Sequence, residues 1–199
     1  MLKKLLIARC MMGLICGSDG LSDEQNFREA PEKYWNYAEL SRVPECRESP
    51  YADSQCEGLR DVLIQGAPVD GKPAEFFAYY GYPETAMPEG GYPAVLLIHG
   101  GGGTAFPQYT NLWLKQGYVV MALDWYNQRP LTNPEKPTET NVARADLDGG
   151  KRQNHEVNVA NMVLAHSLLR SLKNVNPEKT VFVGLSWGSW YGAMVAAVD

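Results

Sequence analysis

The stretch that decides the expected fold is Thr180-Val181-Phe182-Val183-Gly184-Leu185-Ser186-Trp187-Gly188. A short apolar run, typical of a strand, leads directly into a Gly-x-Ser-x-Gly pattern, and residues 187–198 are compatible with a helix. A serine hydroxyl is a weak nucleophile unless a sharp turn presents it clear of the sheet, and flanking glycines leave room for the neighbouring chain. We therefore expect Ser186 to be a catalytic nucleophile. The alternative is a tight glycine-rich turn with an incidental serine.

A second glycine-rich segment, His99-Gly100-Gly101-Gly102-Gly103-Thr104, directly follows the apolar run 94–98. Glycine amides can point at one oxygen without obstruction, and each donor lost from an oxyanion hole costs about 3 kcal/mol of transition-state stabilisation. We expect Gly101 and Gly102 to be donors and the amide of Trp187 to complete the hole. The segment lacks the Gly-Lys-Ser/Thr ending and the G-x-G-x-x-G spacing of nucleotide-binding loops, which excludes a phosphate-binding interpretation.

Strand-like and helix-like segments alternate around these motifs. The expected strands are 59–65, 74–80, 94–98, 118–123 and 180–185, and the expected helices are 107–116, 155–172 and 187–198. The first two strands predict an antiparallel pair at a sheet edge, whereas the later alternation predicts parallel pairing through right-handed crossovers. Asn176-Pro177 is expected to stop the long helix, and 180–185 has the composition of a buried strand. The predicted fold class is α/β, with a mostly parallel sheet and antiparallel N-terminal strands.

The polar stretch 124–154 is unusually long for a loop inside a domain and follows a strand end, where α/β sheets place their ligands. Trp125 and Tyr126 begin it, and we expect them to offer aromatic faces to a substrate. Trp187 and Trp190 at the elbow have two open interpretations, sugar contact or packing of the helix on the sheet.

The motifs Gly184–Gly188 and His99–Phe106, together with Ala165-His166-Ser167-Leu168-Leu169-Arg170-Ser171, resemble the α/β-hydrolase superfamily. The likeness is to its acetyl xylan esterase-like and dienelactone hydrolase-like branch, with prolyl-oligopeptidase-type domains as relatives. It covers residues 92–199. Ser189 departs from the branch, which more often has a glycine there, and it is expected to tighten packing against the strand before the glycine loop. The resemblance implies that the chain is the N-terminal portion of such an enzyme, truncated after the elbow helix.

The three histidines offer no obvious base for Ser186. Triads of this fold run serine, acid, histidine, yet the 13 residues after Ser186 contain no histidine and only Asp199 as a carboxylate side chain. His99 is expected to fix the glycine loop, and His155 and His166 to be structural or solvated. The resemblance implies that the acid and histidine follow the elbow helix, so we expect the 199-residue chain to fold poorly and not to hydrolyse esters.

The N-terminal region divides into a leader and a lead-in segment. Residues 1–17 combine a basic start with a short apolar block, which indicates a secretory signal peptide, although Arg9 interrupts the block. We expect export to the periplasm or outside, with a cytoplasmic protein as the alternative. Residues 18–57 form the lead-in, in which Cys46 and Cys56 would close a disulfide loop in an oxidising compartment. The resemblance implies that residues 58–199 are the N-terminal part of an α/β-hydrolase domain.

Composition excludes several classes of function. The net charge of −5 and the absence of a Lys/Arg run argue against nucleic-acid binding. No apolar stretch approaches the roughly 18 residues of a membrane span, and no residue pattern implies a metal or organic cofactor. The oligomeric state stays open.

The combined expectation is a serine esterase that deacetylates a carbohydrate or another small ester. A dienelactone-type hydrolase or a prolyl-oligopeptidase-like peptidase would use the same machinery, because the fold does not set the acyl donor. The alternative of another class is a non-catalytic fragment or binding remnant.

Overall fold

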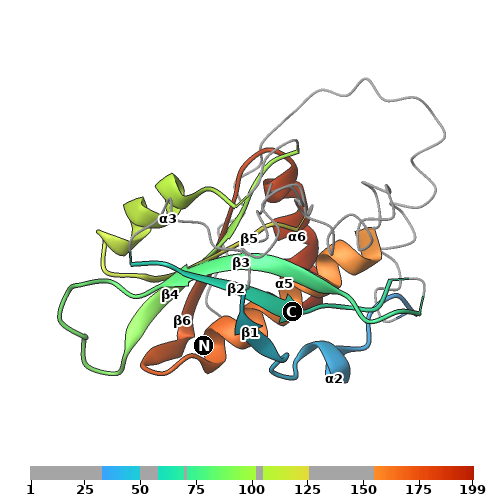
Figure 1. Ribbon diagram of the computed structural model, residues 1–199, viewed down its shortest axis with the longest axis horizontal. Coiled ribbons are helices and arrows are strands. Elements are labelled where there is room, and N and C mark those ends of the chain that lie inside the picture. The colour runs from blue at the N-terminus through green and yellow to red at the C-terminus, as the bar shows by residue number, and fades with distance from the viewer. Residues whose placement is uncertain (1–32, 50–57, 70, 102–104, 126–154) are drawn as a thin grey trace, which may run out of the picture. The chain divides into compact units, whose positions relative to one another are not determined.

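The computed structural model describes residues 33–49, 58–69, 71–101, 105–125 and 155–199 (Figure 1). Residues Trp35–Asp199 form one compact unit, and of the separate Met1–Tyr34 only Lys33 and Tyr34 are described. The expected signal peptide, Tyr126, Gly102 and Cys56 lie outside the described residues. So does most of the long polar loop.

A six-stranded mixed sheet forms the centre of this unit, in the order β1-β2-β3-β5-β4-β6. Its strands are β1 (Cys46–Glu48), β2 (Arg60–Gln65), β3 (Glu75–Gly81), β4 (Tyr92–Ile98), β5 (Val119–Leu123) and β6 (Val175–Gly184). The pairs β1/β2, β2/β3 and β3/β5 are antiparallel, whereas β5/β4 and β4/β6 are parallel. Parallel pairing is therefore confined to β5, β4 and β6. The glycine-rich segment follows the end of β4, Asp124 follows β5, and Ser186 follows β6.

The sequence predicts that the β2/β3 pair lies at a sheet edge, and this prediction is wrong. The pair is antiparallel as expected, but β1 adds to the outer side of β2, with Cys46 opposite Ile64. All three β1 residues are exposed. A short exposed strand has no alternation of apolar and polar residues, so it gives no signal in the sequence.

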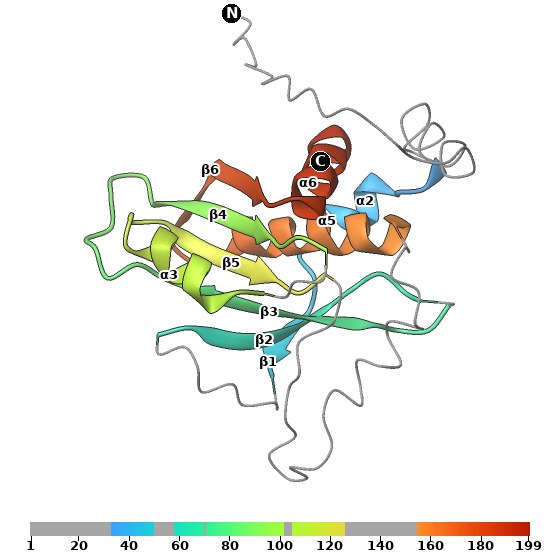
Figure 2. The same cartoon turned by 90° about the horizontal axis from the view of Figure 1, so that it is seen from above.

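Helices cover both faces of the sheet. Helix α3 (Pro107–Leu114) packs on one face, over β5 and β3, and helices α5 (His155–Ser171) and α6 (Trp187–Val198) pack on the other (Figure 2). Helix α2 (Tyr37–Leu40) packs on α5, where the buried Trp35 donates its indole hydrogen to the Glu156 carbonyl at 2.9 Å. The layers are those of an α/β fold, as the sequence predicts.

The long helix ends earlier, and the last strand begins earlier, than the sequence indicates. Helix α5 ends at Ser171, and Asn174 takes a left-handed φ of 66° before β6 begins at Val175. Pro177 therefore lies inside β6. Because Tyr92 pairs with Val175 but Ala94 pairs with Thr180, β6 has extra residues at this point, and a proline is tolerated at such an irregularity on an edge strand.

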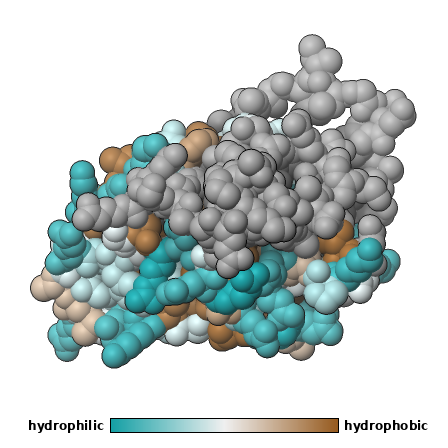
Figure 3. Space-filling view, viewed as in Figure 1, coloured by the Kyte–Doolittle hydropathy of each residue, from teal (hydrophilic) through white to brown (hydrophobic). Residues whose placement is uncertain are grey.

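Strand β6 is not a fully covered strand, contrary to its composition. Val175 is buried, but Val181 is 44% exposed and Phe182 and Val183 are only half-buried. Among the described residues no strand pairs with the free side of β6. Its edge position explains the exposure. On the face shown in Figure 3, apolar and hydrophilic side chains of the described residues are interspersed.

Candidate active site

Ser186 occupies the first corner of a type II′ turn between β6 and α6. Its backbone angles, φ 55° and ψ −118°, lie close to about +60° and −120°, the values of that corner. The Gly188 amide closes the turn by donating to the Leu185 carbonyl at 2.9 Å. An L-residue with positive φ is strained, and glycine usually takes this place. The backbone therefore holds an exposed serine hydroxyl at a position that a relaxed turn would give to glycine.

The two glycines of the motif permit close backbone contacts. A Cβ on Gly188 would overlap the carbonyl oxygen of Ile98 and stand 2.7 Å from that of His99. A Cβ on Gly184 would stand 2.6 Å from the Ser189 amide nitrogen. Helix α6 therefore starts directly against the end of β4, and a side chain at either position would push the elbow away from the glycine loop.

The glycine loop, which we define as His99–Thr104, lies beside the elbow in its described residues His99, Gly100 and Gly101. A Cβ on Gly100 would stand 3.3 Å from the Ser186 Cβ and 3.0 Å from the Leu185 carbonyl oxygen. A Cβ on Gly101 would stand 2.6 Å from Cδ1 of Trp187. The structure thus brings Gly100, Gly101, Ser186 and Trp187 together. Gly102, the other expected oxyanion donor, lies outside the described residues.

Trp187 is the first residue of α6. Its amide belongs to the first turn, where a helix leaves its N–H groups without intrahelical partners. Trp187 is 46% exposed as a residue, and its indole meets Trp190 edge-on, with ring centroids 5.3 Å apart. Trp190 is only half exposed and also contacts His155. Of the two elbow tryptophans, Trp187 is the one that presents an aromatic surface beside Ser186.

Trp125 is not an exposed substrate platform, and this corrects the expectation from the sequence. It is 5% exposed, donates its indole hydrogen to the His99 carbonyl at 2.9 Å, and stacks on the His99 ring at a centroid distance of 5.0 Å. Its other neighbour is Tyr191 of α6, with centroids 4.6 Å apart. An aromatic residue just after a buried strand can point inward or outward, and the sequence does not distinguish the two.

His99 is buried, and its ring contacts the backbone of the glycine loop that it begins. Its Nδ1 lies 2.7 Å from the Gly100 carbonyl oxygen, and its Nε2 lies 3.3 Å from Oδ1 of Asp124. Asp124 is fully buried and directly follows β5. This geometry matches the loop-fixing role expected for His99, and it adds Asp124, which the sequence analysis did not single out. One signal in the sequence could have indicated Asp124. It is a carboxylate that directly follows a buried strand, just as His99 directly follows the adjacent strand.

The other two histidines are engaged within the fold. His155 Nδ1 lies 2.8 Å from the Tyr191 hydroxyl. His166 contacts Asp199 through Nδ1, and its Nε2 lies 2.8 Å from the Thr180 hydroxyl. Within the described part of the chain, no hydrogen bond joins Ser186 to a histidine. None of the three histidines is therefore placed as its base.

Ser189, the departure from the family pattern, does not pack against the strand of the glycine loop as expected. Its side chain is exposed, and its hydroxyl donates to the Gly184 carbonyl at 2.7 Å. Gly188 makes the close contact with β4 instead. Ser189 therefore ties the first turn of α6 to the end of β6.

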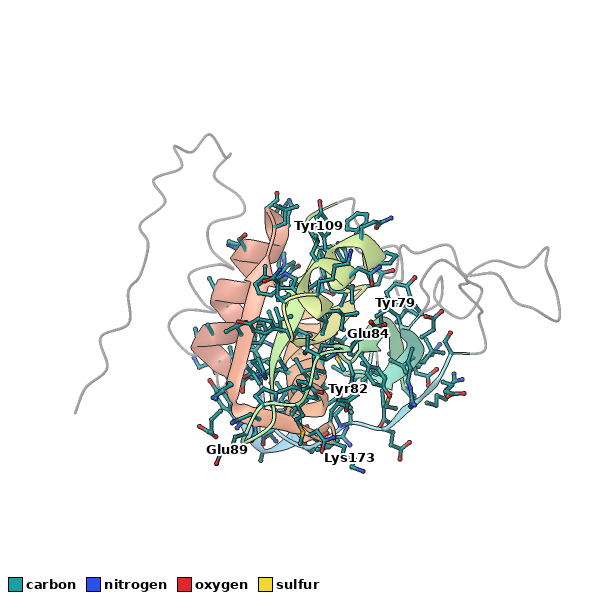
Figure 4. All side chains as sticks on the ribbon, turned by 90° about the vertical axis from the view of Figure 1, so that its left-hand side faces the viewer. Tyr79, Tyr82, Glu84, Glu89, Tyr109 and Lys173 are labelled. Atoms are coloured by element: carbon teal, nitrogen blue, oxygen red, sulfur yellow. The ribbon has the colours of Figure 1, made fainter. Side chains whose placement is uncertain are left out.

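A pocket of about 220 Å³ lies between α3 and the ends of the parallel strands. Its wall is formed by apolar side chains, among them Leu97, Phe106, Tyr109, Trp113 and Leu185, with His99 as a polar member. Figure 4 shows Tyr109 on α3 at one end of the unit, whereas Glu89 and Lys173 lie at the other. Leu185, the residue directly before Ser186, lines this pocket, so the apolar pocket adjoins the turn at Ser186.

Neither a metal centre nor a membrane span is found among the described residues. No three His, Cys, Asp or Glu side chains there come together as ligands. No described helix is both long and apolar enough to cross a bilayer. Cys46 is exposed on β1, and its pairing with Cys56 stays a prediction.

Comparison with known proteins identifies the fold. No model of a known protein family matches the chain, and no curated protein matches it either. Solved structures do. The acetyl xylan esterase of Paenibacillus sp. R4 matches with a TM-score of 0.53 and 17% identity, over 90% of this chain and 60% of the esterase. Acetyl xylan esterase 1 of Thermoanaerobacterium sp. JW/SL YS485 matches with 0.53 and 20%, over 89% and 59%.

These likenesses show that the chain has the α/β-hydrolase fold of acetyl xylan esterases, as the resemblance implied. The chain spans about 60% of the length of these esterases. At such low identity the comparison supports the fold alone.

Proposed function

We propose that Ser186 is the nucleophile of a serine hydrolase of the carboxylic-ester class. The single observation that carries the proposal is the strained type II′ turn, with Ser186 at a φ of 55° and Gly100 against its Cβ. Strain of this kind costs about 1–3 kcal/mol and gathers at functional sites. A structural turn would relieve it with a glycine.

The chemistry follows from the neighbours of Ser186. The hydroxyl attacks the acyl carbon, and the amides of Gly101, Gly102 and Trp187 hold the developing oxyanion. The tetrahedral intermediate then releases the alcohol, which takes up the proton lost by the serine hydroxyl, and water hydrolyses the acyl-enzyme to the free acid and serine. The base is a histidine other than His99, His155 and His166, because each of these is engaged elsewhere. We propose that a longer form of the protein supplies this histidine and its acid.

For the substrate we propose a small or carbohydrate acetyl ester. Two features favour it: the fold shared with acetyl xylan esterases, and the exposed Trp187 indole beside Gly101, on which a sugar ring can stack. The peptidase and dienelactone alternatives use the same nucleophile and differ only in the acyl donor. Export, expected from residues 1–17, belongs to the same proposal, since polymeric acetylated carbohydrates lie outside the cell.

Active-site labelling tests the nucleophile. The chain is incubated with a fluorophosphonate probe, and the labelled serine is identified by peptide mass spectrometry. An oxyanion hole acting without a triad still retains about 10³–10⁴-fold catalysis over water, so Ser186 should label slowly but ahead of every other serine. Ser186→Ala should abolish the label.

Ser189→Ala is the matched control, because Ser189 is also exposed and lies three residues further along the chain, in the first turn of α6. It should label like the wild type. A wild-type chain with no preference for Ser186 would favour the non-catalytic remnant. Steady turnover of p-nitrophenyl acetate at an ordinary enzymatic rate, about 10 s⁻¹, would contradict the proposal that the base lies elsewhere.

A further inference from the structure

The buried contacts behind the glycine loop form one continuous column from β5 to α6. Asp124 faces His99, the His99 ring stacks on Trp125, and Trp125 packs on Tyr191. Tyr191 in turn accepts a hydrogen bond from Asn158 of α5 at 2.9 Å. The column therefore joins His99, where the glycine loop begins, to Tyr191 of α6, the helix that starts directly after Ser186.

The first joint of the column is the His99–Asp124 contact. Because the Gly100 carbonyl can only accept, the His99 Nδ1 at 2.7 Å from it carries a hydrogen. Nε2 then faces Oδ1 of Asp124 at 3.3 Å, with both atoms buried. Nε2 has no hydrogen-bond partner among the described residues, so the Asp124 carboxyl group is its close polar neighbour without a formed hydrogen bond.

The second joint is the Trp125 indole. It reaches the backbone of the loop directly, through the 2.9 Å bond to the His99 carbonyl, and it fixes the ring plane of His99, since the two rings lie within 15° of parallel. The Asp124 backbone is held in turn by its amide, which donates to the Phe77 carbonyl of β3 at 2.8 Å. The column thus rests on the antiparallel half of the sheet, on the side away from β6.

We infer that Asp124 and Trp125 are positioning residues: acting through His99, they hold the glycine loop at the distance from Ser186 that oxyanion binding requires. Neither residue touches the reacting atoms. The inference rests on the proposed function for its catalytic meaning, but the positioning itself is a property of the fold. A displacement of about 1 Å in such a loop can lower a rate 100-fold.

The test uses Asp124→Ala, Asp124→Asn and Trp125→Phe, with Trp35→Phe as the matched control. Trp35 is buried and donates its indole hydrogen to a backbone carbonyl, as Trp125 does, but the acceptor is Glu156 of α5 and Trp35 is not part of the column. Two measurements are made on each folded variant. One is the ¹H–¹⁵N chemical shifts of the Gly100 and Gly101 amides, and the other is the fluorophosphonate labelling of Ser186, resolved into reagent affinity and maximal rate.

We expect Asp124→Ala and Trp125→Phe to shift both amide resonances and to lower the maximal labelling rate at least 10-fold, with reagent affinity nearly unchanged. Asn at position 124 can donate to Nε2, so Asp124→Asn should return the rate to within about threefold of the wild type. Trp35→Phe should leave the amides and the rate unchanged. If Asp124→Ala does not fold, Trp125→Phe and Asp124→Asn carry the test.

Gly100 and Gly101 amides that move no more in Trp125→Phe than in Trp35→Phe would overturn the inference. An Asn variant as impaired as the Ala variant would also overturn it, because charge rather than position would then matter. If wild-type Ser186 does not label while the amides shift as expected, the proposed hydrolase function fails and the positioning role stands.

Discussion

The α-carbon of Gly188 packs directly on the carbonyl oxygen of Ile98, so closely that a methyl group at position 188 would overlap that oxygen. Backbone therefore meets backbone where α6 begins and β4 ends. The contact fixes the turn at Ser186 against the glycine loop without using any side chain, and it leads to the first prediction.

Gly188→Ala is expected to destabilise the fold by about 3 kcal/mol, because the added methyl has no room and both neighbours are main chain. The control is Gly192→Ala in the same helix, where a Cβ would meet nothing within 4 Å. It should stabilise by up to about 1 kcal/mol, the helix-propensity difference between glycine and alanine. Urea unfolding monitored by circular dichroism measures both. Equal effects would show that α6 does not sit against β4 as described.

Ser186→Gly should change stability and labelling in opposite directions. Glycine relaxes at a φ of 55°, so the variant should be more stable than the wild type by about 1 kcal/mol or more, yet take up no fluorophosphonate at this position. Ser186→Ala also loses the label but keeps the strain, so it should not be stabilised. A destabilised glycine variant would contradict the strained turn.

The edge of β6, to which no strand of the described residues pairs, predicts self-association. Val181 is 44% exposed on this strand, and an unpaired edge with apolar side chains is a template for pairing with another chain. Val181→Lys should lower the associated fraction in sedimentation velocity severalfold. Val43→Lys, at a 55% exposed position outside every strand, should leave it unchanged. Wild-type protein that stays monomeric at high concentration would count against this prediction.

Tyr82 should make stability fall at high pH. Partial burial, followed by the neighbouring Tyr80, raises the pKa of Tyr82, whose hydroxyl donates to the Lys173 carbonyl at 2.8 Å. A raised pKa means that the folded state binds this proton more tightly than the unfolded chain. The contribution is therefore complete below the unfolded value of 10.0 and is lost as pH rises through the folded value. Figure 4 shows Tyr82 and Lys173 at the end of the unit away from Tyr109.

Unfolding free energies between pH 8 and 11 measure this effect, with Tyr82→Phe as the comparison. The variant should lose part of the stability at pH 8 and show a shallower decline above pH 10. Parallel curves for the two proteins would rule out the contribution of Tyr82.

The elements nearest the motifs were predictable from the sequence because local chemistry decides them. Helix α6 spans 187–198 as expected, since a glycine-flanked turn must precede it and small residues continue it. The parallel strands β4 and β5 follow from continuous apolar runs. Gly184 and Gly188 were predictable as positions where the backbone approaches closely.

What the sequence did not reveal depends on distant partners. Strand β1 exists only because β2 offers it an edge, and Pro177 lies in a strand only because the β4/β6 register is irregular there. Trp125 looked like a substrate contact because its burial depends on His99 and Tyr191, 26 and 66 residues away in the sequence. The position of Asp124 beside His99 likewise depends on the pairing of β4 with β5.

The turn at Ser186 also has a handedness. Reflecting its angles, φ 55° and ψ −118°, gives about −55° and +118°, a relaxed conformation for an L-residue. A mirror-image serine introduced by chemical ligation would therefore sit at position 186 without strain, but its hydroxyl would project from the opposite side of the α-carbon. The natural L-serine is therefore the strained enantiomer at this position, and it is also the one whose hydroxyl points in the observed direction. The direction of the hydroxyl thus depends on the chirality of residue 186.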